Sequence, residues 1–105
     1  MGAGSVVVVY LRDPRERIWG MLHALVPAGV TVEGIGVDSF DSWLQAIGKE
    51  ADARRDLSVL FFPAGRIERI LLDRGTSQAP SLADRFAARM GRPVPEVLGW
   101  TASEA

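Results

Sequence analysis

Two segments in the first quarter of the chain have the pattern of β-strands that are apolar on both faces. Residues 6–11 read VVVVYL, a short β-branched run without a polar face. Residues 17–26 contain two alternating series of side chains that are mostly apolar: Ile18, Leu22 and Val26 against Trp19, Met21 and Leu25. Strands of this kind must be covered on both sides, so a flat sheet with one solvated face is excluded.

Three further segments predict strands next to turns. Residues 30–37 follow Pro27-Ala28-Gly29, and residues 57–62 and 66–72 flank Pro63-Ala64-Gly65. Proline at the second position and glycine at the end are typical of a type I turn. We therefore expect residues 57–62 and 66–72 to form a hairpin. A helix beginning at RIERILLD is the alternative, and the shortness of the segment favours the strand.

Glycines lie inside two of these strands. Gly20 divides the second strand, and Gly34 and Gly36 lie in the third. A glycine within a strand indicates a bulge or a sharp bend. Five short strands that bend at glycines are typical of a small closed barrel, which removes open sheet edges.

Two helices are marked by apolar spacing and by caps. The first contains Phe40, Trp43, Leu44 and Ile47, with Asp38 or Ser39 as N-cap and Gly48 near its end. The second begins at a capping-box-like pair, Ser81 and Asp84, and ends near Gly91; its apolar stripe is Leu82, Phe86 and Met90.

The expected fold is therefore mainly β with two helices: a strongly bent five-stranded barrel, one helix between the third and fourth strands, and one C-terminal helix. The expected domain covers residues 1–91, and residues 92–105 form a tail that docks on the body or on a partner.

Composition limits the chemistry. The 105 residues include no cysteine and one histidine, and the formal net charge is −1. Disulfides and thiolate metal sites are excluded, and His23 by itself cannot form a multi-histidine site. We expect neither enzymatic activity nor a cofactor or metal. VVVVYL is too short to span a membrane and has no basic residue before it, so a cytoplasmic location is expected.

Basic and aromatic residues give the candidate binding site. Its predicted members are Arg12, Arg15, Arg17, Trp19, Arg66 and Arg69. Arginines next to aromatic rings are typical of proteins that bind single-stranded RNA, where guanidinium groups contact phosphates and rings stack on bases. The favoured alternative is that Trp19 belongs to the core and that the arginines pair with nearby carboxylates. The acidic pairs Asp13–Glu16 and Asp38–Asp41 are interpreted as turn and helix-start residues.

The order of these features resembles the Sm-like (Hfq-like) family of small β-barrels. VVVVYLRDPRERIWGMLHALVPAGVTVEGI resembles the first block of that family, and LSVLFFPAGRI resembles its second block of two short strands around a tight turn. Asp-Pro-Arg-Glu-Arg and Phe-Phe-Pro also resemble features of uncharacterised bacterial proteins. The Sm-like resemblance covers roughly residues 5–72 and implies a ring of subunits joined by edge strands, with RNA bound on a face or in the pore.

The chain departs from the Sm-like pattern at the positions that read bases. Val26-Pro27-Ala28-Gly29 stands where the family has Asp and Asn, and Arg54-Arg55-Asp56 stands where Hfq-like members have Tyr, Lys and His. The N-terminal helix is also missing. We therefore expect a non-catalytic oligomeric assembly module, with RNA binding as the alternative. A small ligand-binding protein or enzyme is a third hypothesis, for which the sequence contains no motif.

Overall fold

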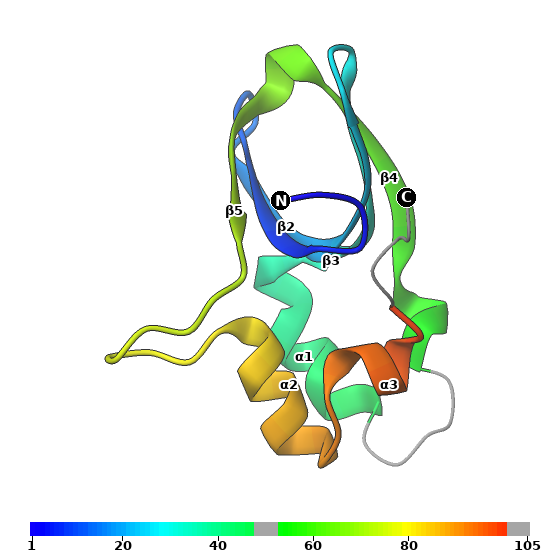
Figure 1. Ribbon diagram of the computed structural model, residues 1–105, viewed down its shortest axis with the longest axis vertical. Coiled ribbons are helices and arrows are strands. Elements are labelled where there is room, and N and C mark those ends of the chain that lie inside the picture. The colour runs from blue at the N-terminus through cyan, green and yellow to red at the C-terminus, as the bar shows by residue number, and fades with distance from the viewer. Residues whose placement is uncertain (48–52, 101–105) are drawn as a thin grey trace.

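The computed structural model describes residues 1–47 and 53–100, and its five strands form one antiparallel sheet in the order β4-β3-β2-β1-β5 (Figure 1). The strands are β1 (Val6–Leu11), β2 (Glu16–Val26), β3 (Gly29–Gly36), β4 (Ser58–Pro63) and β5 (Ile67–Leu72). The helices are α1 (Val37–Ile47), α2 (Leu82–Met90) and α3 (Val94–Leu98), with short 3-10 turns η1 (Ala53–Asp56) and η2 (Ala64–Arg66).

The sheet is strongly curled because its two edge strands are joined by η2 alone. Four strand spacings of about 4.8 Å would separate the edges of a flat sheet by about 19 Å. The chain from Pro63 to Ile67 reaches at most about 14 Å. Figure 1 shows η2 crossing from β4 to β5 at the end of the sheet farthest from the helices.

The curl encloses the first of two apolar cores, which we call the inner core. Both edge strands contribute to it, through Leu60 and Phe62 of β4 and through Ile67, Ile70 and Leu72 of β5. Its fully buried members come from the three central strands: Val7, Val9, Leu11, Ile18, Leu22, Val30 and Val32. The inner core thus accounts for the apolar side chains on one of the two faces of these strands.

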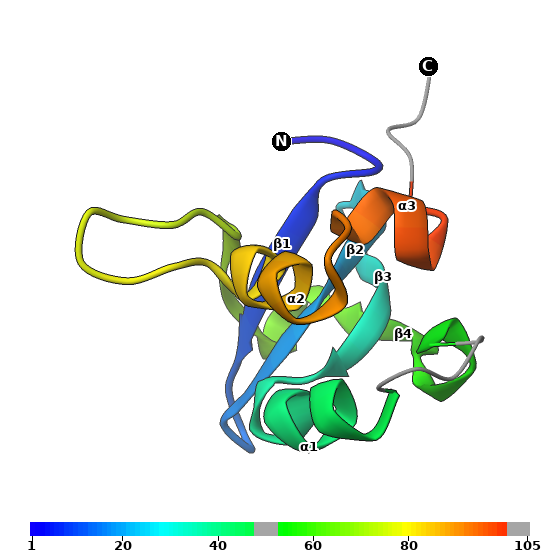
Figure 2. The same ribbon diagram turned by 90° about the horizontal axis from the view of Figure 1, so that it is seen from below.

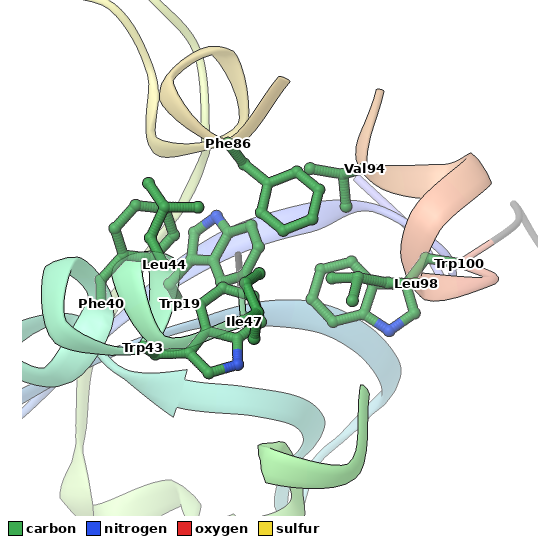
Figure 3. Packing of buried hydrophobic residues seen from close by; sticks show 9 residues of the cluster. All are labelled: Trp19, Phe40, Trp43, Leu44, Ile47, Phe86, Val94, Leu98 and Trp100. Carbon is green, nitrogen blue, oxygen red and sulfur yellow. The ribbon is translucent and has the colours of Figure 1, made fainter. Parts of the chain in front are cut away.

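The second core, the outer core, lies between the other face of the sheet and the three helices (Figures 1 and 2). Trp19 of β2 is fully buried there, 5.1 Å from the rings of both Phe40 and Trp100. Figure 3 shows the buried set: Trp19, Phe40, Trp43, Leu44, Ile47, Phe86, Val94, Leu98 and Trp100. The helices supply the cover that the second face of the sheet requires.

Asp73, at the end of β5, joins the sheet to α2. Its carboxylate accepts hydrogen bonds from the backbone N–H groups of Leu82 and Ala83, at 3.1 and 2.8 Å, and from Trp19 Nε1 at 2.9 Å. A carboxylate at the start of a helix is favoured by the unpaired N–H groups and by the helix dipole. Asp73 therefore fixes α2 against the outer core.

Two predictions about β4 and β5 are wrong. The sheet is not closed into a barrel, since among the described residues β4 pairs only with β3 and β5 only with β1. For the same reason the two strands do not form a hairpin. The link η2 carries the chain across the open end of the curl, so β4 and β5 lie at opposite edges. The strand prediction for residues 66–72 is confirmed, and the helix alternative is not.

The positions of the two predicted helices are confirmed, but the predicted start of the first helix is wrong. A helix follows β3 and another follows β5, as predicted, and Ser81 and Asp84 form the capping box of α2, with Gly91 left-handed at its end. The first helix begins at Val37, so Asp38 and Ser39 lie inside it and are not its N-cap. Gly48 lies outside the described residues.

A third helix, α3, occurs within residues 92–105, which the sequence predicts as a tail. Val94, Leu98 and Trp100 are buried in the outer core. This segment is therefore packed on the body as far as residue 100, and the last five residues lie outside the described part.

Gly20 and Gly34 face each other across β2 and β3. A Cβ atom on either residue would overlap backbone of the opposite strand, so these glycines permit a close approach of the two strands. The irregular register of β2 lies elsewhere, between Leu22 and Ala24. The prediction of a bulge at Gly20 is corrected accordingly.

Candidate interaction surface

The two unpaired edges of the sheet differ in character. Residues 58–63 of β4 read SVLFFP and carry no charge, and Val59 and Phe61 are 62% and 54% exposed. On β5, Glu68 and Arg69 are exposed and form a contact of 3.6 Å, and Leu71 is 44% exposed. An uncharged apolar edge strand is the kind of edge that pairs readily with another chain.

The position of both edges is fixed by a clamp around η2. Arg66 donates hydrogen bonds to the carbonyl oxygens of Arg12 and Pro14, at 3.1 and 2.8 Å, and to Glu16 Oε2 at 2.9 Å. Arg12 donates in return to the carbonyl oxygens of Gly65 and Ile67, at 3.2 and 3.3 Å. These two guanidinium groups hold η2 against the β1–β2 turn, which is a structural role.

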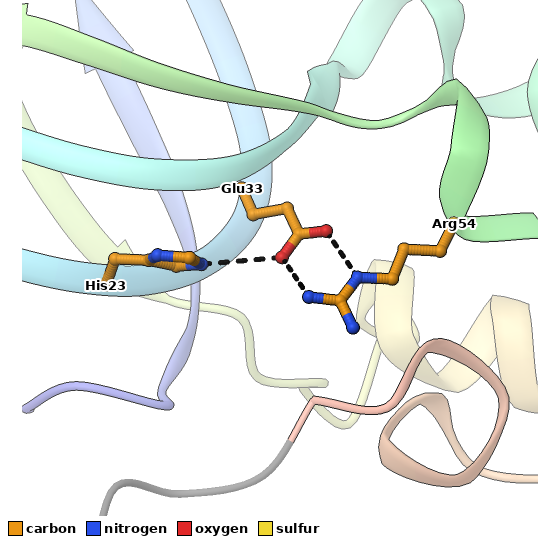
Figure 4. A network of polar contacts seen from close by, with 3 residues as sticks. All are labelled: His23, Glu33 and Arg54. Carbon is orange, nitrogen blue, oxygen red and sulfur yellow. Dashed lines mark hydrogen bonds and ion pairs between the residues drawn. The ribbon is translucent and has the colours of Figure 1, made fainter.

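A polar network holds the start of β4. Glu33 on β3 is 4% exposed, and its carboxylate accepts two hydrogen bonds from Arg54 of η1, at 2.7 and 2.9 Å (Figure 4). His23 Nε2 of β2 lies 3.4 Å from Glu33 Oε1. Since η1 directly precedes β4, the pair formed by Glu33 and Arg54 anchors the entrance to the apolar edge. Glu33 is the one charged residue in the strand segment TVEGIG. This isolated charge is the sequence signal that could have revealed the network.

The hydrogen bonds from Arg54 lower the pKa of Glu33 below its ordinary value of 4.5, although burial opposes this shift. A carboxylate with a lowered pKa in the folded state stabilises the fold above its unfolded pKa. This contribution is lost as the pH falls through the folded pKa.

We therefore expect the difference in unfolding free energy between the wild type and Glu33→Gln to be constant near neutral pH. It should shrink as the pH falls below about 4.5, the region where an unfolded glutamate titrates. Urea unfolding of both proteins from pH 7 to pH 3 measures this difference, and the other carboxylates, present in both proteins, cancel. A difference that stays flat over the whole range would contradict this assignment.

The predicted binding residues are divided by the structure into three groups. Trp19 is fully buried among aromatic rings, so the prediction that it stacks on a base is wrong. Arg12 and Arg66 belong to the clamp around η2. The other three, Arg15, Arg17 and Arg69, line one surface groove with Tyr10.

Three of the four residues in the predicted acidic pairs form ion pairs with arginines. Glu16 contacts Arg66, and Asp41 contacts Arg85, which joins α1 to α2. Asp38 lies 3.7 Å from Arg17. Glu16, Asp38 and Asp41 thus each connect two parts of the fold.

Within the described residues, no helix has the length and apolar character needed to cross a membrane, and no group of three His, Cys, Asp or Glu side chains is placed to hold a metal ion. No protein-family model, curated protein or solved structure matches this chain.

Proposed function

We propose that this protein is a non-catalytic, Sm-like assembly module that associates with copies of itself through the two edges of its sheet. The observation that carries the proposal is the pair of unpaired edge strands, β4 and β5, at opposite ends of one curled sheet. The proposal also rests on the Sm-like resemblance of the sequence over roughly residues 5–72, which implies subunits joined by edge strands.

Pairing between β4 of one copy and β5 of the next uses two different surfaces. Such a heterologous contact leaves a free edge at each end of a growing chain, and a ring results when the rotation closes. The contact would cover the exposed side chains of Val59 and Phe61 and satisfy the free backbone groups of both edges. The clamp around η2 and the contact between Glu33 and Arg54 hold the two edges in place for this contact.

A charged residue in the apolar edge should separate the copies. We expect Phe61→Glu to elute as a monomer at micromolar concentration, where the wild type elutes as an oligomer, because a carboxylate buried between two strands is strongly unfavourable. Gln45→Glu, at an exposed position of α1, adds the same charge and should leave the assembly intact. Circular dichroism shows whether both variants are folded. A Phe61→Glu variant that remains oligomeric would contradict the proposal.

RNA binding is a second candidate, favoured by the grouping of Arg15, Arg17 and Arg69 in one groove. Three phosphate contacts to a single strand predict a slope of about −2 for the logarithm of affinity against that of salt concentration. A pool of single-stranded RNAs titrated at several salt concentrations measures this slope. The absence of retention at low salt would rule this candidate out.

A further inference from the structure

The groove that contains the three arginines is a distinct feature of the surface. It has a volume of about 370 Å³ and lies between the β1–β2 turn, the start of α1 and strand β5. Its polar lining comes from Tyr10, Arg15, Arg17, Asp38, Glu68 and Arg69, together with Glu16. The volume is within the range of sites that bind small molecules.

The guanidinium groups in the groove have unused hydrogen-bond donors. Within the described part, Arg15 has neither a hydrogen bond nor an ion pair, and the ion pairs of Arg17 and Arg69 are long, at 3.7 and 3.6 Å. By contrast, Arg12 and Arg66 donate to backbone carbonyls at 2.8 to 3.3 Å. Three guanidinium groups that line one groove and have free donors are suited to a phosphate, which they can bind in a bidentate manner.

The carboxylates of the groove compete weakly with such a ligand. Glu16 is already bound by Arg66 at 2.9 Å. The side chains of Asp38 and Glu68 are 98% and 46% exposed, and their contacts with arginine are longer than a hydrogen bond. Exposed ion pairs of this kind contribute little to stability. A dianionic phosphate can therefore displace them.

One member of the groove also offers a stacking surface. The guanidinium carbon of Arg69 lies 4.3 Å from the centre of the Tyr10 ring, and the Arg69 side chain is 55% exposed. Tyr10 thus contacts the guanidinium group of Arg69. Because the Arg69 side chain is more than half exposed, a planar ring can reach it from solvent, and guanidinium groups stack on nucleobases.

We propose that this groove binds a small phosphate monoester that carries a planar ring, of the size of a nucleoside monophosphate. Arg15 and Arg17 contact the phosphate, and the ring stacks on Arg69. The groove does not include the apolar edge β4, but Arg69 belongs to β5, the other edge of the assembly proposed above. The Phe61→Glu variant, which is expected to be monomeric, therefore presents the groove without a neighbouring copy.

Isothermal titration with adenosine 5′-monophosphate tests this proposal, with adenosine and inorganic phosphate as partial ligands. We expect saturable one-site binding of the nucleotide, and binding at least about tenfold weaker for either part alone. Arg15→Ala and Arg69→Ala should each weaken nucleotide binding by about tenfold or more, whereas Arg89→Ala, at an exposed position of α2, should not change it. Phe61→Glu should bind the nucleotide as the wild type does, which separates this result from any failure of assembly.

Two outcomes would overturn the proposal. The first is the absence of saturable binding, or binding that Arg15→Ala and Arg69→Ala leave unchanged. The second is a short RNA with a 5′-phosphate that binds at least about tenfold more tightly than the mononucleotide and loses affinity in both variants. That result would assign the groove to the end of an RNA chain.

Discussion

Replacing Asp73 with alanine is expected to lower the free energy of unfolding by about 2–4 kcal/mol. Two effects combine in this value. The variant removes the acceptor for the first N–H groups of α2, and it leaves Trp19 Nε1 without a partner at a fully buried site. A buried donor without an acceptor loses the hydration that it has in the unfolded chain.

Urea unfolding measures the effect of Asp73→Ala, with Trp19→Phe as a second variant that separates the two contributions. Phenylalanine keeps an aromatic ring and removes the N–H group, so Asp73→Ala should destabilise the Trp19→Phe protein less than the wild type. Asp38→Ala is the matched control, because the Asp38 side chain is 98% exposed and its ion pair with Arg17 is long, at 3.7 Å. Equal losses in Asp73→Ala and Asp38→Ala would contradict the junction described here.

The second large effect concerns the contact between Glu33 and Arg54, where we expect the two partners to respond unequally. The carboxylate of Glu33 is buried, whereas the Arg54 side chain is 49% exposed. Arg54→Ala therefore leaves a buried charge whose remaining polar partner among the described residues is His23, and the expected loss is about 2–4 kcal/mol. Glu33→Gln leaves a half-exposed guanidinium group and should cost about 1 kcal/mol.

A double-mutant cycle tests this asymmetry. The protein with both Arg54→Ala and Glu33→Gln contains no buried charge at this position, so it should be more stable than Arg54→Ala alone. Arg89→Ala, on the surface of α2, should have the stability of the wild type. A Glu33→Gln variant that is less stable than Arg54→Ala would contradict the claim that Arg54 compensates the buried charge of Glu33.

The elements themselves can be predicted from the sequence where their signals are local. The capping box of Ser81 and Asp84 lies within one helical turn, and the β-branched run of residues 6–11 specifies a strand without help from elsewhere. Asp38 and Ser39 are residue types that favour both the N-cap and the first turn of a helix. The sequence pattern alone therefore does not show that the helix begins at Val37, before both residues.

The arrangement of the elements depends on contacts between residues far apart in the chain. The Pro63-Ala64-Gly65 turn is compatible with a hairpin, and only the curl of the whole sheet places β4 and β5 at opposite edges. The burial of Trp19 likewise depends on α1 and on the segment that contains Trp100. Arg12 and Arg66 differ from Arg15 in their contacts because η2 crosses the β1–β2 turn, which no local pattern indicates.

The mass of the native protein in solution is the most direct test of assembly through the sheet edges. One chain has a mass of 11.4 kDa, and light scattering or native mass spectrometry at micromolar concentration gives the number of chains per particle. We predict a discrete particle of several chains that dissociates when Phe61 is replaced with glutamate. A wild-type protein that is monomeric at this concentration would contradict the account.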